Sequence, residues 1–437
     1  MRLGLNRLAL LLLLFGLCRT AEARPSEEDP PQTIKSRLFE PEKTPFKDLL
    51  LAPFRAPEYV LRTVLYPVSR FVLWAEEVHL EDRIIDILSD GSKRIWFYPS
   101  ADYSTNDGFF LGGKFLFKNM FYQRKNLSAS ADLYTNLDHK FSVSYSRSQT
   151  VSSPLSYKFK TSYGNNSNAK FYGFGIDSGS ADKSVYADRK ASASVRLGWR
   201  FPRAPFLTVS ASVGPDYSRT GPGNPADERP SIDDLFDPDT LHGYDEENIW
   251  LRYGLAISYN SSLPSGNPSR GGRVSLGIDR FEDFLGGHTY VQLKGQATRM
   301  FSLGSPRRVL ALSAQFKSVE DWGGKVPFQR LSSLGESSPL RGFSNGRFRD
   351  RRLLLGNLEY RFMVWQSASV EPVYGLGTLF LDVGRTFDQF EELGDGVIKY
   401  SVGTGFLIAS TKSFYLRGQV GYGGEGVESI FSFGRAF

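Results

Sequence analysis

The sequence predicts an all-β protein: a transmembrane antiparallel β-barrel of about 16 strands, preceded by a short N-terminal helical periplasmic segment. Three observations support this fold class. The N-terminus has the order of a secretory signal peptide, and no later segment has the roughly twenty consecutive apolar residues of a membrane helix. From Arg94 to Phe437 apolar and polar residues alternate with a period of two.

Residues 1–23 are expected to be the signal peptide. Arginines precede an apolar core, Leu8–Leu17, and Ala21–Ala23 supplies the small residues of a cleavage site. The alternative, an anchor helix, is disfavoured because an apolar run of about ten residues is too short to span a bilayer. The only cysteine, Cys18, would leave with this peptide. We therefore expect an exported mature chain without disulfides or thiolate metal sites.

The composition excludes other classes of protein. Aromatic residues make up 14% of the chain while its mean hydropathy is −0.30, which is typical of alternating strands and not of a helical membrane protein. The three arginines and one glutamate of the signal peptide account for +2 of the formal net charge of +6, which leaves +4. Because lysine and arginine are spread along the chain and not clustered on one face, we expect no nucleic-acid partner.

No pattern of catalytic or metal-binding residues stands out. The four histidines are scattered, and no serine, histidine and aspartate fall into the context of a catalytic triad. An acidic loop could bind a divalent cation through Asp233, Asp234, Asp237 and Asp239. A solvated acidic loop is the interpretation that we favour. We expect no enzymatic activity, no cofactor and no metal.

Two segments precede the expected barrel. Residues 24–44 are rich in proline and charge and are expected to form a disordered leader. Residues 45–92 place apolar residues such as Leu61 and Leu65 near helical spacing, interrupted by prolines. Two or three short amphipathic helices fit this pattern. They could lie against the periplasmic rim, recognise a partner or plug the lumen.

Residues 93–437 are expected to form the barrel. One face of each strand is apolar, while the residues between are small or polar, as in the run Leu310, Leu312, Ala314 and Phe316. The apolar face is assigned to lipid. Short connections such as Pro202–Pro205 alternate with long ones such as Arg219–Glu247, and short turns face the periplasm in outer-membrane barrels. The competing architecture is a soluble β-sandwich or propeller.

The end of the chain favours the membrane barrel over the soluble alternatives. Phe431, Phe433 and Phe437 follow a period of two in the final strand. This resembles the C-terminal signal read by the barrel assembly machinery, which we expect as a partner for insertion into the bacterial outer membrane. Arg435 departs from the usual apolar pattern.

The most informative motif lies in the long loop between the expected eleventh and twelfth strands. Its sequence, Pro339-Leu340-Arg341-Gly342-Phe343, resembles the lumenal loop motif of the BamA/TamA superfamily, also called the bacterial surface antigen family. Two further matches follow in the order of the family's strands. Residues 356–362 resemble its twelfth strand, and Phe380–Gly384 resembles its thirteenth. The resemblance spans Tyr98–Phe437 and includes an F-x-G-x-G sequence at Phe171–Gly175.

The same stretches predict a buried ion pair. The period of two points both Glu359 and Asp382 into the lumen. A guanidinium inside a barrel needs charge-matched acceptors, and paired carboxylates can supply bidentate hydrogen bonds. We therefore expect Arg341 to meet both carboxylates in a lumenal loop lock, and the alternative is an incidental surface arginine. The rest of the loop and strand motif consists of Leu340, Gly342, Phe343, Phe380 and Gly384.

The resemblance implies a barrel that assists membrane insertion or translocation of polypeptides through a weak seam between its first and last strands. Its family usually carries POTRA domains, periplasmic modules of three strands and two helices that feed clients to the barrel, and the stretch before Arg94 has no alternating runs of that kind. Recruitment of clients would fall to the helices or to a periplasmic partner. The alternative is a surface antigen, adhesin or narrow channel barrel without insertase activity.

Overall fold

The computed structural model of the chain describes residues 37–38, 57–67, 69–70, 74, 86–92, 94–104, 108–120, 124–135, 138–149, 153–224, 227–262, 269–285, 287–335, 340–366, 373–394, 396–410 and 415–434. The expected signal peptide lies outside these residues, as does the expected leader except for Arg37–Leu38.

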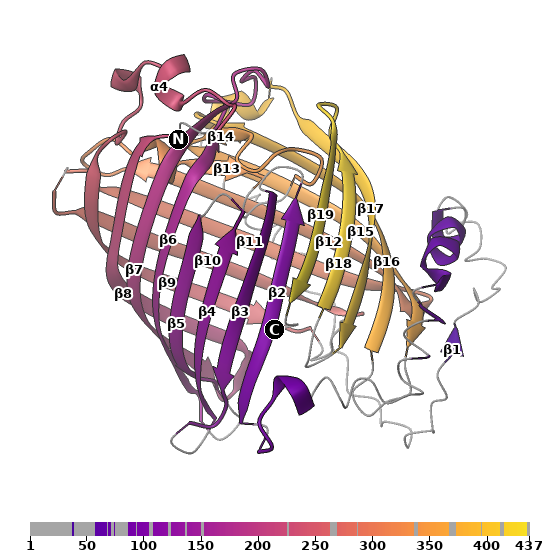
Figure 1. Cartoon of the computed structure of the whole chain (residues 1–437). Coiled ribbons are helices and arrows are strands. Elements are labelled where there is room, and N and C mark those ends of the chain that lie inside the picture. Colours follow the sequence, from indigo (N-terminus) through magenta and orange to yellow (C-terminus); the bar gives the residue numbers. More distant parts are fainter. Residues whose placement is uncertain are drawn as a thin grey trace, which may run out of the picture.

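The chain folds into a closed antiparallel β-barrel (Figure 1). Within the described ranges, consecutive wall strands pair with each other, and β19 pairs with β2 to close the barrel. The predicted fold class and its sixteen strands are confirmed. These strands are β2 (Ile95–Ser104), β3 (Gly108–Phe117), β4 (Lys125–Tyr134), β5 (His139–Arg147), β6 (Leu155–Phe171), β7 (Ser184–Phe201), β8 (Ala204–Pro222), β9 (Glu247–Asn260), β10 (Gly271–Asp283), β11 (Tyr290–Leu303), β12 (Ser305–Asp321), β15 (Arg352–Gln366), β16 (Val373–Phe387), β17 (Lys399–Ser410), β18 (Tyr415–Tyr422) and β19 (Val427–Gly434).

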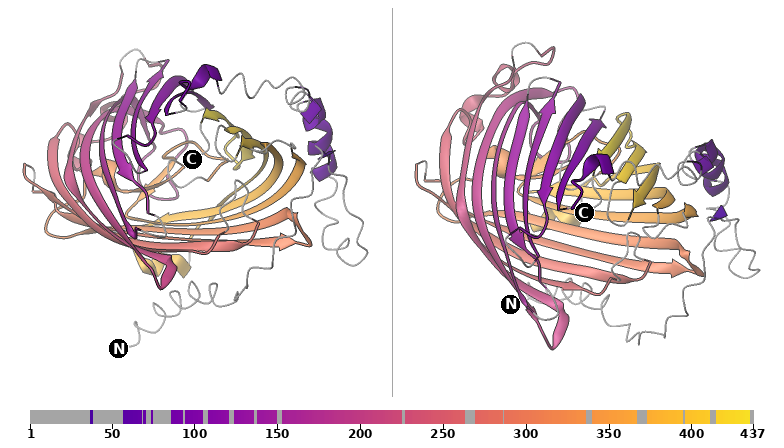
Figure 2. Two further views of the ribbon diagram at one scale, coloured as in Figure 1. Left: turned by 90° about the horizontal axis from the view of Figure 1, so that it is seen from below. Right: turned by 60° about the horizontal axis from the view of Figure 1, so that its bottom comes forward.

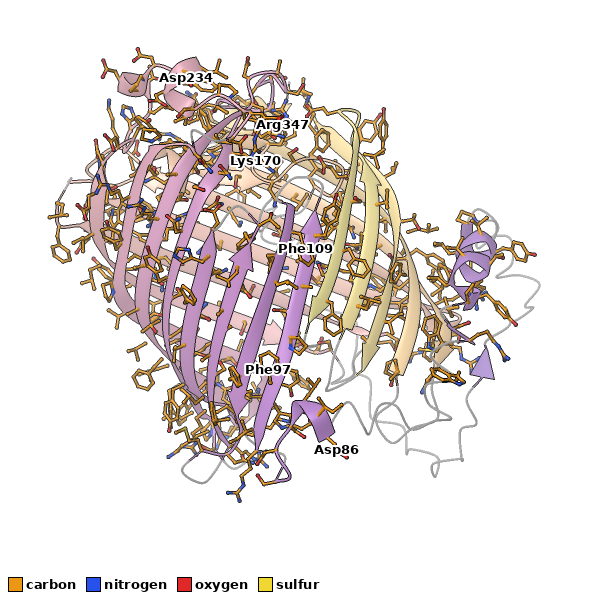
Figure 3. The ribbon with its side chains drawn as sticks, viewed as in Figure 1. Asp86, Phe97, Phe109, Lys170, Asp234 and Arg347 are labelled. Carbon is orange, nitrogen blue, oxygen red and sulfur yellow. The ribbon has the colours of Figure 1, made fainter. Side chains whose placement is uncertain are left out.

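The two faces of the wall follow the period of two seen in the sequence. Large apolar side chains stand exposed on the outside, among them Leu255 and, in Figure 3, Phe97 and Phe109. The inner face carries small polar residues, and the hydroxyls of Ser130 and Ser142 lie 2.8 Å apart across β4 and β5. An exposed apolar band of this extent is typical of a wall surrounded by lipid.

The connections differ between the two ends of the barrel. Residues 202–203 alone join β7 to β8, and Gly304, with a φ of 77°, joins β11 to β12. At the other end, the loop after β8 carries α4 (Ile232–Leu235) and η1 (Pro238–Thr240). The loop after β12 carries η2 (Phe328–Arg330) and a small hairpin of β13 (Ser332–Leu334) and β14 (Phe348–Asp350), whereas η3 (Phe390–Gly394) follows β16. The short turns mark the periplasmic end.

The helix of residues 57–67 and β1 (Arg37–Leu38) lie outside the barrel wall (Figure 2). The helix formed by residues 57–67 packs against the outer face of β15, so a lumen plug is the wrong interpretation for it. Arg37–Leu38, expected in the disordered leader, instead forms β1, which pairs with Trp365 and Gln366. This pairing is available because β12 stops pairing with β15 at Phe362, which leaves the end of β15 open on that side.

Before β2, the described residues contain short helical segments and β1, rather than the three strands and two helices of a POTRA domain. Among the helices that the structure describes, none has the length and apolarity needed to cross a bilayer.

If the apolar face of the wall contacts lipid, a charge introduced on that face should destabilise the barrel more than a charge introduced on the lumenal face. Leu255, 61% exposed near the middle of β9, should lose about 2–4 kcal/mol of folding free energy on substitution by arginine. Ser258→Arg, on the lumenal face of the same strand, is the control and should cost much less. Urea titration of folding into lipid vesicles measures both, and equal losses would contradict the assigned faces.

Candidate functional site

The long loop between β12 and β15 folds back onto the inner wall of the barrel. Leu340 and Phe343 are buried in an apolar cluster with the inward-facing Leu353 and Leu355 of β15. The cluster also contains Leu334 of β13 and Phe348 of β14, so the small hairpin packs into the same core. Apolar residues on the lumenal face of β15 therefore hold the loop in place.

Arg341 lies between these apolar residues and points at two carboxylates of the wall. Its Nε and Nη2 donate to the two carboxylate oxygens of Asp382, at 2.8 and 2.7 Å. Its Nη1 donates to Glu359 at 2.7 Å, and its backbone N–H donates to Asp382 at 3.1 Å. The side chain of Asp382 is fully buried and that of Arg341 is 8% exposed. The contact that the sequence predicted is present, and it is bidentate on Asp382.

The register of three adjacent strands places Asp382 between two side chains that donate hydrogen bonds to it. Asn357, Asp382 and Ser401 lie side by side on β15, β16 and β17. The amide of Asn357 and the hydroxyl of Ser401 donate to Asp382, at 2.8 and 3.3 Å. Glu359 also accepts from Arg361 at 2.6 Å. Each oxygen of these two buried carboxylates therefore accepts at least one hydrogen bond, which offsets the cost of burying it.

The remaining residues of the motif supply packing and close approach. The guanidinium of Arg341 lies over the ring of Phe380, 3.6 Å from its centroid. Gly342 has no room for a side chain, since a Cβ there would lie 2.4 Å from the backbone nitrogen of Gly423. At Gly384 a Cβ would come within 3.2 Å of Leu334. The loop backbone thus contacts both the wall and the end of β18.

A second buried arginine of the loop, Arg347, was not singled out by the sequence analysis. Its Nε and Nη2 donate to Glu425, in the turn between β18 and β19, at 2.7 and 2.9 Å. Its Nη1 and Nη2 donate to Ser178 in the loop after β6. Ser344 donates to Glu428 of β19 at 3.2 Å. We call the pairs Arg347–Glu425 and Ser344–Glu428 the hairpin latch; Arg347 lies at the long-loop end of the barrel (Figure 3).

The F-x-G-x-G sequence joins the same assembly. Phe171 is fully buried, and Gly173 and Gly175 adopt φ values of 90° and 85° that favour glycine. The backbone N–H of Gly175 donates to the carbonyl of Arg349 at 2.8 Å, which ties this loop to β14. The sequence marked the motif, but its spacing gave no indication of this partner.

The junction between β2 and β19, which we call the seam, is the shortest pairing of wall strands among the described residues. It consists of four residue pairs, from Ala101–Phe433 to Ser104–Ile430, whereas β2 and β3 form ten. In the described part of the chain, Ile95–Ser100 of β2 lack a partner residue on β19. Ser432 donates to Asp102 across the seam at 3.0 Å. The described pairing with β19 thus covers the half of β2 nearer the long loops, whereas near the start of β2 Trp96 forms an antiparallel bridge with Ser89.

The C-terminal phenylalanines fall partly inside the described residues. Phe431 is 43% exposed and pairs with Tyr103 at the seam, and Phe433 pairs with Ala101. Phe437 lies outside the described residues, and the role of these residues as an assembly signal stays a prediction.

In the acidic loop, carboxylates of Asp234 and Asp237 accept backbone N–H groups of their own turns. The described residues contain no cluster of three or more potential metal ligands.

Comparisons with known proteins agree with this architecture. A sequence profile of the Omp85 superfamily domain matches residues 119–434. BamA from Haemophilus ducreyi lacking POTRA domains 1–3 is similar in structure, with a TM-score of 0.56 and 14% identity over 78% of this chain and 70% of that chain. CdiB from Escherichia coli has a TM-score of 0.54 and 12% identity over 77% of this chain and 62% of that chain.

CdiB from Acinetobacter baumannii has a TM-score of 0.50 and 14% identity over 78% of this chain. This chain covers 60% of that protein and so spans less than two thirds of either CdiB chain. A search of curated proteins finds no significant match. At these identities the structural likeness concerns the fold.

Removal of Arg341 tests the loop lock. Arg341→Ala leaves Asp382 buried without its main partner, so it should cost about 3–5 kcal/mol and impair assembly or activity. The control is Arg351→Ala in the same loop, 39% exposed and paired with Asp321, for which roughly 0–1 kcal/mol is expected. Thermal unfolding in detergent and proteolysis of the loop measure the effect. A variant that assembles, unfolds and functions like the parent would refute the lock.

The pH dependence of the loop follows from Asp350 of β14, outside the wall strands. Burial raises the pKa of Asp350 to about 6, with the nearby carboxylates of Asp388 and Glu392 adding to the rise and the N–H of Arg351 opposing it. Because this pKa lies above the ordinary 3.8, the ionised form is disfavoured in the fold. Stability is therefore gained as the pH falls from about 6 towards 4.

Asp350→Asn should remove that dependence. The variant should be more stable than the parent at pH 8, by at most about 3 kcal/mol, and the difference should vanish near pH 4. Melting temperatures at both pH values check it, with Asp239→Asn, an exposed aspartate of a different loop, as the control. Parallel pH profiles for parent and Asp350→Asn would contradict the assignment.

Proposed function

The chain belongs to the Omp85 superfamily, and from this premise we propose that its outer-membrane barrel assists membrane insertion or translocation of polypeptides through the seam between β2 and β19. The observation that carries the proposal is the shortness of the seam. Within the described residues four residue pairs hold the seam, so separating them breaks fewer backbone hydrogen bonds than opening the neighbouring junctions of β18 with β19 or of β2 with β3.

The position of the paired residues supports entry of clients from the periplasm. In the described residues β19 pairs with Ala101–Ser104 and does not extend along the periplasmic half of β2, where Ser89 bridges Trp96. Strand edges accept an added strand through main-chain hydrogen bonds. An unfolded barrel client could therefore pair its own strand with β2 as the seam opens and Ser89 is displaced, and we take the edge of β2 as the client-binding element.

The long loop supports the proposal from the other end of the seam. The hairpin latch holds the turn after β18 and the start of β19 against the loop. The loop lock holds the same loop against β15 and β16. Because both contacts lie on one loop, the long-loop end of the seam stays fixed while the periplasmic end is free to separate. This asymmetry suits a seam that opens towards the source of its clients.

A disulfide across the seam tests the proposal. The sequence has a single cysteine, Cys18, in the expected signal peptide, so paired cysteines can be introduced without competition. Asp102→Cys with Ser432→Cys replaces two side chains whose oxygens are 3.0 Å apart across the seam. When oxidised, this variant should lose its acceleration of the folding of an unfolded barrel client into vesicles, and reduction should restore it.

The control places the same disulfide within the wall. Ser130→Cys with Ser142→Cys joins β4 to β5, where the two hydroxyls are 2.8 Å apart, and it should leave activity unchanged. If the parent barrel does not accelerate client folding, the result favours the alternative function of a passive surface antigen, adhesin or channel. If the oxidised seam variant is as active as the reduced one, insertion does not proceed through the seam.

A further inference from the structure

The helix of residues 57–67 has its charged residues on the side that faces the barrel. Its sequence contains two charged residues, Glu58 and Arg62, one helical turn apart, and both contact the wall. The side facing away from the wall is apolar apart from Thr63. Its large apolar residues are exposed to 52–74%: Tyr59, Val60, Val64 and Tyr66. A helix bordering water has the opposite arrangement, with its charges outward.

The surface beneath this helix belongs to the lipid-facing side of the wall. Leu61 and Leu65 pack on a cluster that includes Tyr360 and Phe362 of β15. These two rings are on the same face of β15 as Leu354, which is 38% exposed, but they are 2% and 0% exposed. The helix therefore occupies space on the outer wall that lipid occupies elsewhere (Figure 2).

A buried polar contact fixes the helix to the wall. The carboxylate of Glu58 accepts the hydroxyl of Tyr360 at 3.2 Å and the Nη2 of Arg308 at 3.4 Å. Arg62 donates to Glu58 at 2.8 Å and to the backbone carbonyl of Met363 at 3.0 Å. Arg308 pairs with Phe362 across β12 and β15 and so lies on the lipid-facing side, with 11% of its side chain exposed. Glu58 supplies the counter-charge that Arg308 needs there.

The contact lies close to the periplasmic turns of the barrel. Arg308 is three residues after the first residue of β12, which directly follows the turn at Gly304, so it is about 10 Å from that turn along the strand. Outer-membrane barrels carry aromatic girdles at this level, where one end of a tyrosine is apolar and the other is hydrated. Tyr59 and Tyr66 extend such a girdle outward from the wall.

We infer that helix 57–67 is an interfacial membrane helix, docked on the barrel through Glu58 and Arg308, whose outward face contacts the lipid of the periplasmic leaflet. The partner of this surface is the acyl and headgroup boundary of the bilayer. The helix packs on the side of the wall formed by β15 and its neighbours and does not lie across the seam. The inference is independent of the proposed function.

Spin labelling of the full mature barrel in phospholipid vesicles tests the inference. A nitroxide on Val64→Cys should collide more often with oxygen, which concentrates in lipid, than with a water-soluble nickel chelate. Leu255→Cys on the outer wall is the lipid reference. Leu235→Cys in α4, an apolar residue that is 48% exposed in a long loop, is the aqueous reference. Val64 should match Leu255 and differ from Leu235.

Two results would overturn the inference. Accessibility to the nickel chelate at Val64 equal to that at Leu235 would place the outward face in water. Protection from both reagents would show that protein, such as a second copy of the chain, covers it. Glu58→Ala tests the docking contact, because it leaves Arg308 without its counter-charge and should raise the mobility of the Val64 label. Unchanged mobility, with the exposed Glu391→Ala as control, would remove Glu58 from the docking contact.

Discussion

The interior of the barrel depends on one buried ion pair, that between Arg341 and Asp382. A guanidinium removed from water is tolerated only with acceptors of matching charge and geometry. Three adjacent strands provide them by placing Asn357, Asp382 and Ser401 side by side beneath the loop. Asp382 is fully buried, so without the loop its carboxylate would be buried without Arg341. Without the register of β15, β16 and β17, Arg341 would in turn lack its acceptor.

The residues next to Arg341 in the loop make further contacts with the wall and with other loops. Phe343 and Leu340 flank Arg341 and pack on the lumenal face of β15. Arg347, six residues further on, then reaches the turn of the last hairpin, and Gly175 pairs with Arg349. The loop thus joins the C-terminal strands of the seam to the centre of the wall. A barrel with a short terminal pairing gains a fixed end in this way.

A charged side chain on the outer wall also needs a partner, because lipid surrounds it. Apolar side chains are stable there because lipid surrounds them, and a charge such as that of Arg308 needs a partner on the outside. The N-terminal helix supplies that partner through Glu58 and presents apolar residues to its surroundings. In the lumen an arginine of the loop pairs with carboxylates of the wall, and on the outside an arginine of the wall pairs with a carboxylate of the helix.

The sequence alone determined the barrel, the number of its strands and the face on which each residue lies, because a period of two in a strand fixes the side of every side chain. It also predicted the partners of Arg341, since parity placed Glu359 and Asp382 inward. What it left open depends on contacts between segments far apart in the chain. The pairing of Arg347 with Glu425, the length of the seam and the position of helix 57–67 leave no periodic trace. Strand register, barrel closure and the docking of a helix on a distant strand arise only when the wall is assembled, and the tertiary structure alone decides them.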